Sequence, residues 1–310
     1  MKHAFDEICM ATSLFMVGDA TSVAYRNIRD SKDGVLYRAK HHCEYLWIFF
    51  KHYADPDFRT ELRNEFDARY WEMYLTVSLI LAGFSVTCPK PGPDVGIIYK
   101  GKRIWFEAVS PTPGHPASPD YVSQPAAGEA SRVPNEKIVL RYLNSISDKY
   151  DRQYSNWRAK NIISGEDAYV VALNPRQIWH DHSDTNPPRI LQAGYTVGSP
   201  YVVIDRNTGQ SVRSGYHFRG AIEKEKRDGQ EKATEIQTGV FQDNKHLALS
   251  ALLCSRVDAA NRPGEMGDDF QMAPNPHATV PLPEGFRLRG TYYESKVVKD
   301  GYDVTPIESA

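Results

Sequence analysis

The segment from Asp94 to Val109 constrains the fold most strongly. Two apolar runs flank Lys100-Gly101, and a two-residue loop with a glycine is typical of a β-hairpin. In that hairpin, paired residue numbers sum to 201, so Asp94 lies opposite Glu107 with Cβ atoms roughly 5 Å apart. Two like charges at that distance repel each other, and a carboxylate in an apolar strand is costly unless it is paired. The pattern predicts a cation at this end of the hairpin.

Two other interpretations of this segment stay open. A longer turn would shift the register and separate the two acids. Alternatively, both acids lie at a frayed, hydrated end of the hairpin and carry no function. The apolar residues that surround Glu107 on both sides favour the cation site over a frayed end.

The remaining chain predicts an α/β fold with a mixed central sheet, because helices and short strands alternate along it. An apolar helix is expected from Thr60 to Ala82, and a second helix from Asn135 to about Lys160. Strands are expected at Phe84–Cys88, Asp94–Tyr99, Lys102–Val109, Ala168–Leu173, Tyr201–Ile204 and Asp269–Ala273. Residues 110–134 are predicted to form a long surface loop, and Phe241–Val257 a helix or a strand–helix unit.

Composition limits the class of protein. The 310 residues are 41% apolar and 25% charged, which is typical of a globular chain that can bury a core. The chain contains no run of about 18 uncharged apolar residues, so the sequence predicts no membrane span. The 37 basic and 39 acidic residues leave a formal charge of −2, so bulk charge gives no reason to expect nucleic acid. The four cysteines form no C-x-x-C pair, which predicts reduced thiols and a cytoplasmic protein.

The order of the acidic residues resembles the active-site motif of the PD-(D/E)XK nuclease superfamily, which has the restriction-endonuclease-like fold. In that family an aspartate is followed, after a spacer, by (Asp/Glu)-x-Lys. Asp94 matches the aspartate and Glu107 matches the second acid. Glu72 matches an extra acid that many members carry on the helix before the sheet. The likeness covers about residues 65–175, and it rests on order and spacing rather than on any single residue.

The sequence departs from the family at the motif lysine, because Val109 stands at that position. Some members carry the lysine on the following helix instead. We expect Lys149 to replace it, with Lys137 as the second choice. Arg141, Lys149, Gln153 and Trp157 share one face of that helix approximately, and a solvated helix face is the alternative interpretation.

The resemblance implies a metal-dependent phosphodiesterase or endonuclease. Its catalytic residues would be Glu72, Asp94, Glu107 and Lys149. Asp94 and Glu107 would hold Mg²⁺ or Mn²⁺, with Glu72 as a further ligand, because oxygen-only ligands favour these ions over Zn²⁺. The implied partner is nucleic acid, with DNA favoured, and a homodimer is compatible with cutting two strands.

The resemblance also suggests how the chain is divided. We expect a single domain over residues 1–310, with a restriction-endonuclease-like core at residues 61–205. Residues 1–60 are expected to form a helical N-terminal decoration. Residues 206–310 are expected to form an irregular C-terminal extension packed on the core.

Two other functions remain open at this point. The absence of a lysine at Val109 is compatible with a nuclease-like module that binds without catalysis. The residues His180, His182 and Asp184 resemble part of the metal signature of metallo-β-lactamase-like hydrolases, although Thr185 stands where that signature has its last histidine. The third hypothesis is therefore a metallohydrolase built on this cluster.

Overall fold

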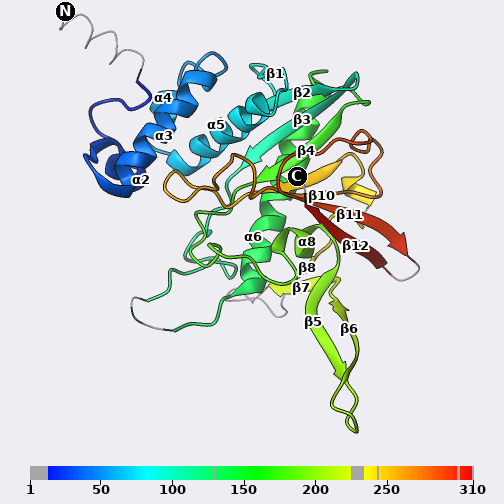
Figure 1. The fold of residues 1–310 in the computed structure, drawn as a ribbon. Helices are drawn as coiled ribbons and strands as arrows, with labels where there is room; N and C mark the ends of the chain where they lie inside the picture. Colours follow the sequence, from blue (N-terminus) through cyan, green and yellow to red (C-terminus); the bar gives the residue numbers. More distant parts are fainter. Residues whose placement is uncertain are drawn as a thin grey trace, which may run out of the picture.

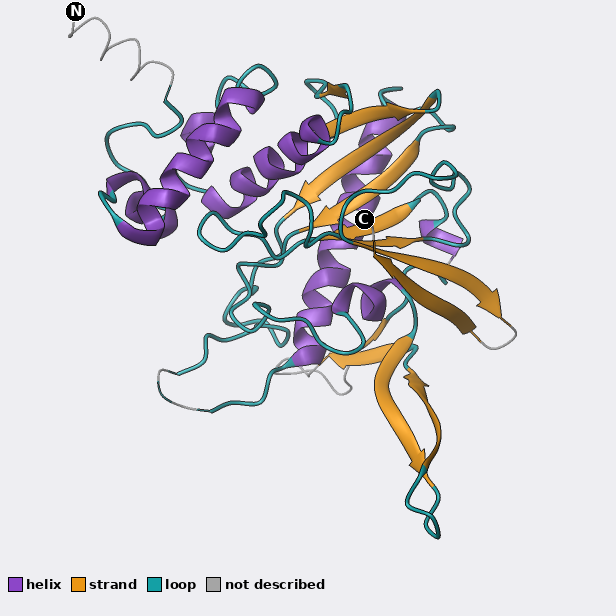
Figure 2. Ribbon diagram, viewed as in Figure 1, coloured by secondary structure: helices purple, strands orange, loops and turns teal. Residues whose placement is uncertain are grey.

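The computed structural model describes residues 13–126, 128, 130–224, 234–242, 244–298 and 301–308. A mixed eight-stranded sheet runs through its centre with helices on both faces, which confirms the predicted α/β class (Figure 2). The spatial order of the strands is β1-β2-β3-β4-β9-β10-β11-β12. Their bounds are β1 Val86–Thr87, β2 Val95–Tyr99, β3 Lys102–Val109, β4 Ala168–Leu173, β9 Ala251–Cys254, β10 Gln271–Pro274, β11 Thr291–Val298 and β12 Gly301–Glu308.

The helices lie on two sides of this sheet (Figure 1). Their bounds are α2 Val23–Asp30, α3 Gly34–Phe50, α4 Phe58–Leu62, α5 Phe66–Leu81, α6 Asn135–Asp148, the π-helix η1 Lys149–Tyr154, α7 Ser155–Ala159, α8 Arg189–Gly194 and the 3₁₀ turn η2 Asn244–His246. Among the described residues, no helix is long and apolar enough to cross a membrane.

The β2–β3 hairpin has the predicted register. Tyr99 pairs with Lys102 and Val95 with Phe106, so the paired numbers sum to 201. Lys100 and Gly101 form the two-residue loop, and both have positive φ angles, of 48° and 76°. A turn with positive φ at both central residues matches the twist of the strands on either side.

Two hydrophobic clusters cover the two faces of the sheet. Helices α3 and α5 contribute to the first cluster together with Phe106 of β3, and α6 and α8 contribute to the second together with Tyr169 of β4. Helix α5 is buried on almost every side, as its apolar sequence predicts. The indole Nε1 of Trp71 donates to the carbonyl of Ala172 over 2.9 Å, which fixes the start of α5 over the end of β4.

The helix predicted from Thr60 to Ala82 is wrong in one respect. It is two helices, α4 and α5, separated by a turn at residues 63–65. The carbonyl of Arg63 accepts from the backbone N–H of Ser22 over 3.0 Å, and the side chain of Asn64 accepts from Thr21. These contacts with a distant segment hold the turn, so local helix propensity does not decide its conformation.

The prediction of a buried strand at Tyr201–Ile204 is also wrong. Among the described residues, strand β5 (Val197–Ile204) pairs only with β6 (Ser211–Phe218), and the two form a hairpin that projects from the body of the protein (Figure 1). Val202 and Ile204 are 59% and 58% exposed. A short apolar run does not show by itself which elements will cover it.

The C-terminal part contributes to the sheet more than predicted. Strand β9 pairs directly with β4, so the central sheet extends well beyond residues 61–205. Within Phe241–Val257 the structure has η2 and β9 rather than a helix after a strand. Strand β10 is close to the predicted last strand, yet β11 and β12 follow it as a long hairpin. A further small hairpin pairs β7 (Ala221–Lys224) with β8 (Thr234–Gln237).

The predicted long loop between β3 and α6 is fixed near its middle by Asp120. This buried carboxylate accepts a hydrogen bond from the Ser118 hydroxyl. Its Oδ2 also accepts hydrogen bonds of 3.0 Å from Arg141 Nη1 and from Asn144 Nδ2. It also pairs with Lys224 over 3.0 Å. Arg141 was expected to share a helix face with Lys149, but its guanidinium contacts this loop instead.

Asp120→Asn is expected to destabilise the fold by about 2–4 kcal/mol at pH 7, because it leaves two partly buried cations, Arg141 and Lys224, without a carboxylate. Burial alone would raise the pKa of Asp120, but the hydrogen bonds of Ser118, Lys224 and Arg141 hold it well below its usual 3.8. A carboxylate with a lowered pKa stabilises the fold above its unfolded value and loses this effect as the pH falls through its folded value. Urea denaturation should therefore show the largest difference between wild type and variant at pH 7, and a smaller one well below pH 3.8. An equal difference in the free energy of unfolding at both pH values would contradict the stabilising role of the Asp120 carboxylate.

Candidate active site

The acids of the β2–β3 hairpin lie where the two strands separate. Asp94 directly precedes β2 and Glu107 lies near the end of β3, so the backbone ladder stops at the pair before them. Asp94 Oδ2 accepts a hydrogen bond from the backbone N–H of Ala108 over 2.7 Å. This bond holds the Asp94 carboxylate across from the end of β3, beside Glu107.

The side chain of Lys149 reaches Glu107 from η1, the π-helix that follows α6. It is the first residue of η1, where α6 changes to π-helical hydrogen bonding, a change frequently found at functional sites. Its Nζ lies 2.9 Å from Glu107 Oε1, and the two side chains are 20% and 4% exposed. The structure thus brings together three of the four predicted residues. Lys137 lies twelve positions earlier, about 18 Å along the helix, and so does not share this location.

The other oxygen of Glu107 has an unusual environment. Its Oε2 is buried, and no described residue forms a hydrogen bond with it. The indole of Trp157 faces the carboxylate closely enough to lower its pKa, although the two do not meet hydrogen-bond geometry. The hydroxyl of Tyr169 is also buried without a partner among the described residues, and its pKa is raised by burial and by the charges of Glu107 and Asp94. Since buried polar atoms are normally bonded, this location can accept a cation or water.

The charges of the site shift the pKa values of its members. Burial raises the pKa of Glu107 above its usual value, the charge of Asp94 raises it further, and Lys149 and Trp157 oppose these effects. Burial lowers the pKa of Lys149, but the nearby charges of Glu107 and Asp94 outweigh it, so this pKa lies above its usual value. The ammonium therefore stays charged and is held by the acids.

Glu72 lies on α5 and has cationic partners of its own. Arg69 Nη1 lies 2.5 Å from its Oε2, and Lys90 Nζ lies 3.8 Å from its Oε1. Burial and the charge of Asp94 raise the pKa of Glu72, while Arg69 and Lys90 lower it. The influence of Asp94 shows that the acids share one region. Both oxygens of Glu72 form ion pairs, so its role as a direct metal ligand remains a prediction. Glu107 uses one oxygen in an ion pair, and Asp94 accepts one backbone hydrogen bond.

Two cations of this region were missed by the sequence analysis. Lys90 pairs with Asp55 over 2.9 Å as well as with Glu72. Arg69 precedes Glu72 by three residues, and this helical spacing is a signal that would have predicted their contact. Lys90 lies in the Pro-rich turn before β2, and no regular spacing relates it to either acid.

The described residues contain no group of three or more His, Cys, Asp or Glu side chains placed to hold a metal ion. A three-carboxylate site is therefore not preformed. Mg²⁺ needs less than that from a protein, because it commonly binds one or two carboxylates and keeps waters or substrate phosphates as its other ligands. Asp94 and the unpartnered oxygen of Glu107 fit this requirement, and their donor atoms are all oxygen.

The histidine cluster after β4 has other contacts. The Nδ1 of His182 lies against a guanidinium nitrogen of Arg176. Asp184 Oδ1 accepts from the backbone N–H groups of Thr185 and Arg189, over 2.8 and 3.0 Å, and so fixes the loop before α8. These contacts make the cluster part of a structural network in the described residues, and they do not favour a metal site there.

Three further cations follow Lys149 on η1, on α7 and just after it, and each has a contact within the protein. Arg152 pairs with Asp148 over 3.1 Å, and Arg158 donates to the carbonyl of Ile163 over 2.6 Å. Lys160 lies over the ring of Trp157, 5.4 Å from its centre.

Comparisons with protein-family profiles, curated protein sequences and solved structures gave no significant match. The likeness to the PD-(D/E)XK superfamily therefore stays a prediction from the residues. The geometry of the site stands independently of it: two acids at the end of a hairpin, a buried carboxylate oxygen to which no described residue bonds, and a lysine that reaches them from a π-helix.

Proposed function

We propose that this chain is a metal-dependent nuclease with a restriction-endonuclease-like core, which hydrolyses phosphodiester bonds of nucleic acid, with DNA favoured. One observation supports this most directly. Lys149 Nζ contacts one oxygen of Glu107 at 2.9 Å, while the other oxygen is buried without a partner among the described residues, next to Asp94. Carboxylates that can bind a cation thus lie beside an ammonium group that can bind a phosphate.

Each residue has a role in this proposal. Asp94 and Glu107 hold Mg²⁺ or Mn²⁺, which supplies a Lewis acid that neutralises negative charge on the scissile phosphate. Lys149 orients the attacking water or stabilises the charge that develops on the phosphoryl oxygens. The ion pair with Glu107 holds the Lys149 ammonium in position, and the backbone N–H of Ala108 does the same for Asp94. Glu72 increases the negative charge of the region.

Two alternatives remain. A binding module without catalysis is compatible with Val109, but the retention of buried acids at one place argues against it, because buried charges cost stability. A metallohydrolase that uses the cluster around His182 is less favoured, since the contacts with Arg176 and the loop occupy these side chains.

A cleavage assay tests the proposal. Purified protein is incubated with supercoiled plasmid, single-stranded DNA and RNA, in Mg²⁺, in Mn²⁺ and in EDTA. We expect cleavage of at least one substrate with a divalent ion and none in EDTA. Cleavage of RNA alone would correct the proposed substrate, and cleavage that continues in EDTA would sink the metal-dependent mechanism.

The charge balance makes a further prediction. The formal charge is −2, and Asp120 holds the guanidinium of Arg141, so we expect few phosphate contacts without a metal ion. Binding of DNA in EDTA should be weak and lost at modest salt, and Ca²⁺ should strengthen it. Fluorescence anisotropy with a labelled duplex measures this, and tight salt-resistant binding in EDTA would contradict it.

A further inference from the structure

The β5–β6 hairpin and its loop, residues 197–218, form an arm that projects from the body of the protein (Figure 1). Large apolar side chains of this arm lie in water, since Val202, Ile204 and Val212 are 59%, 58% and 62% exposed. Among the described residues, no third strand pairs with the arm. A two-stranded hairpin is marginally stable by itself, and adjacent exposed apolar residues mark interaction surfaces. The arm therefore has the composition of a surface that another molecule covers.

One face of the arm carries no charge. Val202 pairs with Ser214, and Pro200 pairs with Tyr216, so these side chains lie on the same face of the hairpin. Arg213 is offset by one residue from Ser214 and so lies on the opposite face. Two copies of the chain can bring their uncharged faces together without a contact between like charges, whereas nucleic acid would require cations there. The partner that fits this face is a second copy of the chain.

The loop at the end of the arm presents a guanidinium group. Arg206 is exposed there. The neighbouring Asp205 accepts hydrogen bonds from the backbone N–H groups of Asn207 and Thr208, over 2.7 and 3.3 Å, so its carboxylate is engaged in the turn. Guanidinium groups bind carboxylates well. The surface that receives the arm should therefore be apolar and should carry carboxylates.

A groove at the foot of the arm has this character. It has a volume of about 590 Å³ and lies between the arm, the loop before α8 and the β11–β12 hairpin. Phe218 and Tyr216 in its lining are 70% and 46% exposed, so apolar side chains are accessible from solvent. Asp303 and Glu308 of the lining are exposed as well, and no described lysine or arginine lines the groove. The arm and the groove are thus complementary in apolar character and in charge.

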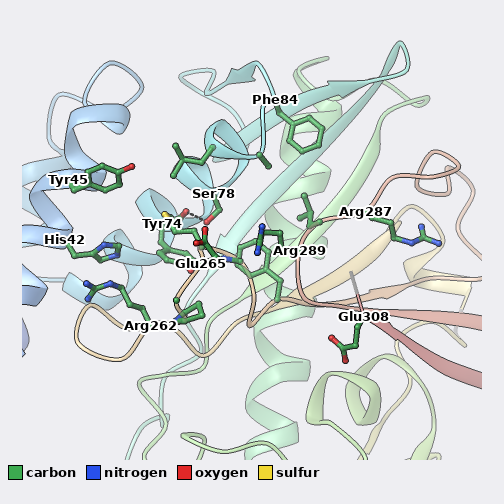
Figure 3. A pocket seen from close by; sticks show the side chains of 18 of the residues that line it. His42, Tyr45, Tyr74, Ser78, Phe84, Arg262, Glu265, Arg287, Arg289 and Glu308 are labelled. Carbon is green, nitrogen blue, oxygen red and sulfur yellow. Dashed lines mark hydrogen bonds between the residues drawn. The ribbon is translucent and has the colours of Figure 1, made fainter. Parts of the chain in front are cut away.

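The pocket between α3 and α5 does not match the arm in this way (Figure 3). Its floor includes Tyr74 and Phe270, whose rings are buried and pack edge to face with centres 6.2 Å apart. Three arginines belong to its lining: Arg262, Arg287 and Arg289. Their charge has the same sign as that of the arm's tip, so this pocket does not favour the arm as its occupant.

We propose that two copies of this chain associate by exchanging arms, so that each arm lies in the groove of the other copy. The uncharged faces of the two arms pack against each other, and Arg206 at each tip approaches Asp303 of the second copy. Such an interface has a twofold axis, so every contact occurs twice. The formal charge of −2 opposes the association only weakly. None of the proposed catalytic residues lies on the arm or lines the groove, so this proposal does not depend on the nuclease function.

Sedimentation equilibrium of the full chain tests the exchange of arms. Wild type should have the mass of two chains at micromolar concentration. Val202→Asp places a charge on the uncharged face and should raise the dissociation constant of the dimer by about tenfold or more, and Ile204→Asp should do the same. Ile48→Asp, at a residue of α3 that is 61% exposed, is the matched control and should associate like wild type. Circular dichroism establishes that each variant folds.

A charge exchange tests where the arm lies. Arg206→Glu should weaken the dimer less than Val202→Asp does, and this effect should shrink at high salt because the ion pair lies near the surface. Asp303→Arg should weaken the dimer in the same way. The two substitutions together place opposite charges beside each other again, so the double variant should recover association. Additive weakening in the double variant would show that the proposed position of the arm is wrong.

Three other results would overturn the proposal. They are a monomeric wild type, equal association of wild type and Val202→Asp, and a Val202→Asp chain of unchanged mass that no longer binds DNA, which would assign the arm to nucleic acid. Glu107→Gln should associate like wild type. A chain that cleaves DNA as a monomer contradicts only the exchange of arms, and a dimer that cleaves no nucleic acid contradicts only the nuclease function.

Discussion

Glu107→Gln is expected to reduce metal-dependent cleavage by about 10³-fold or more, since it removes the carboxylate that faces both Lys149 and the proposed ion. Glutamine keeps the size of the side chain but contributes no negative charge. The loss should appear in the cleavage rate at saturating substrate, measured with the plasmid and strand substrates described above. Binding of Mn²⁺, followed by calorimetry, should weaken in parallel.

Glu294→Gln is the matched control for this experiment. Glu294 also lies in a strand, β11, but it is exposed and far along the sheet from β3. Its variant should cleave like wild type. Circular dichroism and thermal unfolding of Glu107→Gln establish that it folds. A folded Glu107→Gln protein with wild-type activity would remove Glu107 from the catalytic site.

Lys149→Met is expected to lower the cleavage rate by about 10²–10³-fold, because methionine fills a similar volume but cannot orient water or stabilise charge on a phosphate. Binding of Mn²⁺ should be retained, since Asp94 and Glu107 are still present. This combination distinguishes a lysine that acts on the substrate from one that only supports the metal site. Lys296→Met, at an exposed lysine of β11, is the matched control and should be fully active.

A rescue experiment tests whether a lysine at position 109 can replace Lys149. Val109 lies two residues after Glu107 on β3, so its side chain points to the same face of the sheet. A lysine introduced there approaches the acids from the strand instead of the helix. Val109→Lys combined with Lys149→Met should recover part of the activity that Lys149→Met loses. Full activity of Lys149→Met by itself would instead show that the lysine is dispensable.

The hairpin was predictable because residues close together in the sequence determine its turn and its register. A glycine in the turn and the alternation of its strands determine the register, and the register alone places Asp94 next to Glu107. Lys149 was chosen because the resemblance allows the motif lysine on the following helix, and the structure places its Nζ 2.9 Å from Glu107 Oε1. The change to a π-helix at Lys149 had no signal in the sequence.

Other features depend on partners that sequence patterns do not reveal. Arg141 shares a helix face with Lys149, yet Asp120 takes its guanidinium into the loop before α6. The apolar run at Tyr201–Ile204 looks like a core strand, but it pairs with β6 in the projecting hairpin and is largely exposed. Lys90 contacts Glu72 across a turn without regular spacing. In each case the outcome depends on tertiary contacts, which outweigh local preference.

A single plasmid-cleavage assay in Mg²⁺ tests the central claim most directly, with wild type, Asp94→Asn and His182→Ala run side by side. Asp94→Asn keeps the shape of the side chain but removes the charge that the proposed ion requires, and His182→Ala disrupts the competing histidine cluster. We expect wild type and His182→Ala to convert supercoiled plasmid to nicked or linear forms, and Asp94→Asn to leave it supercoiled. Equal cleavage by wild type and Asp94→Asn would contradict the central claim.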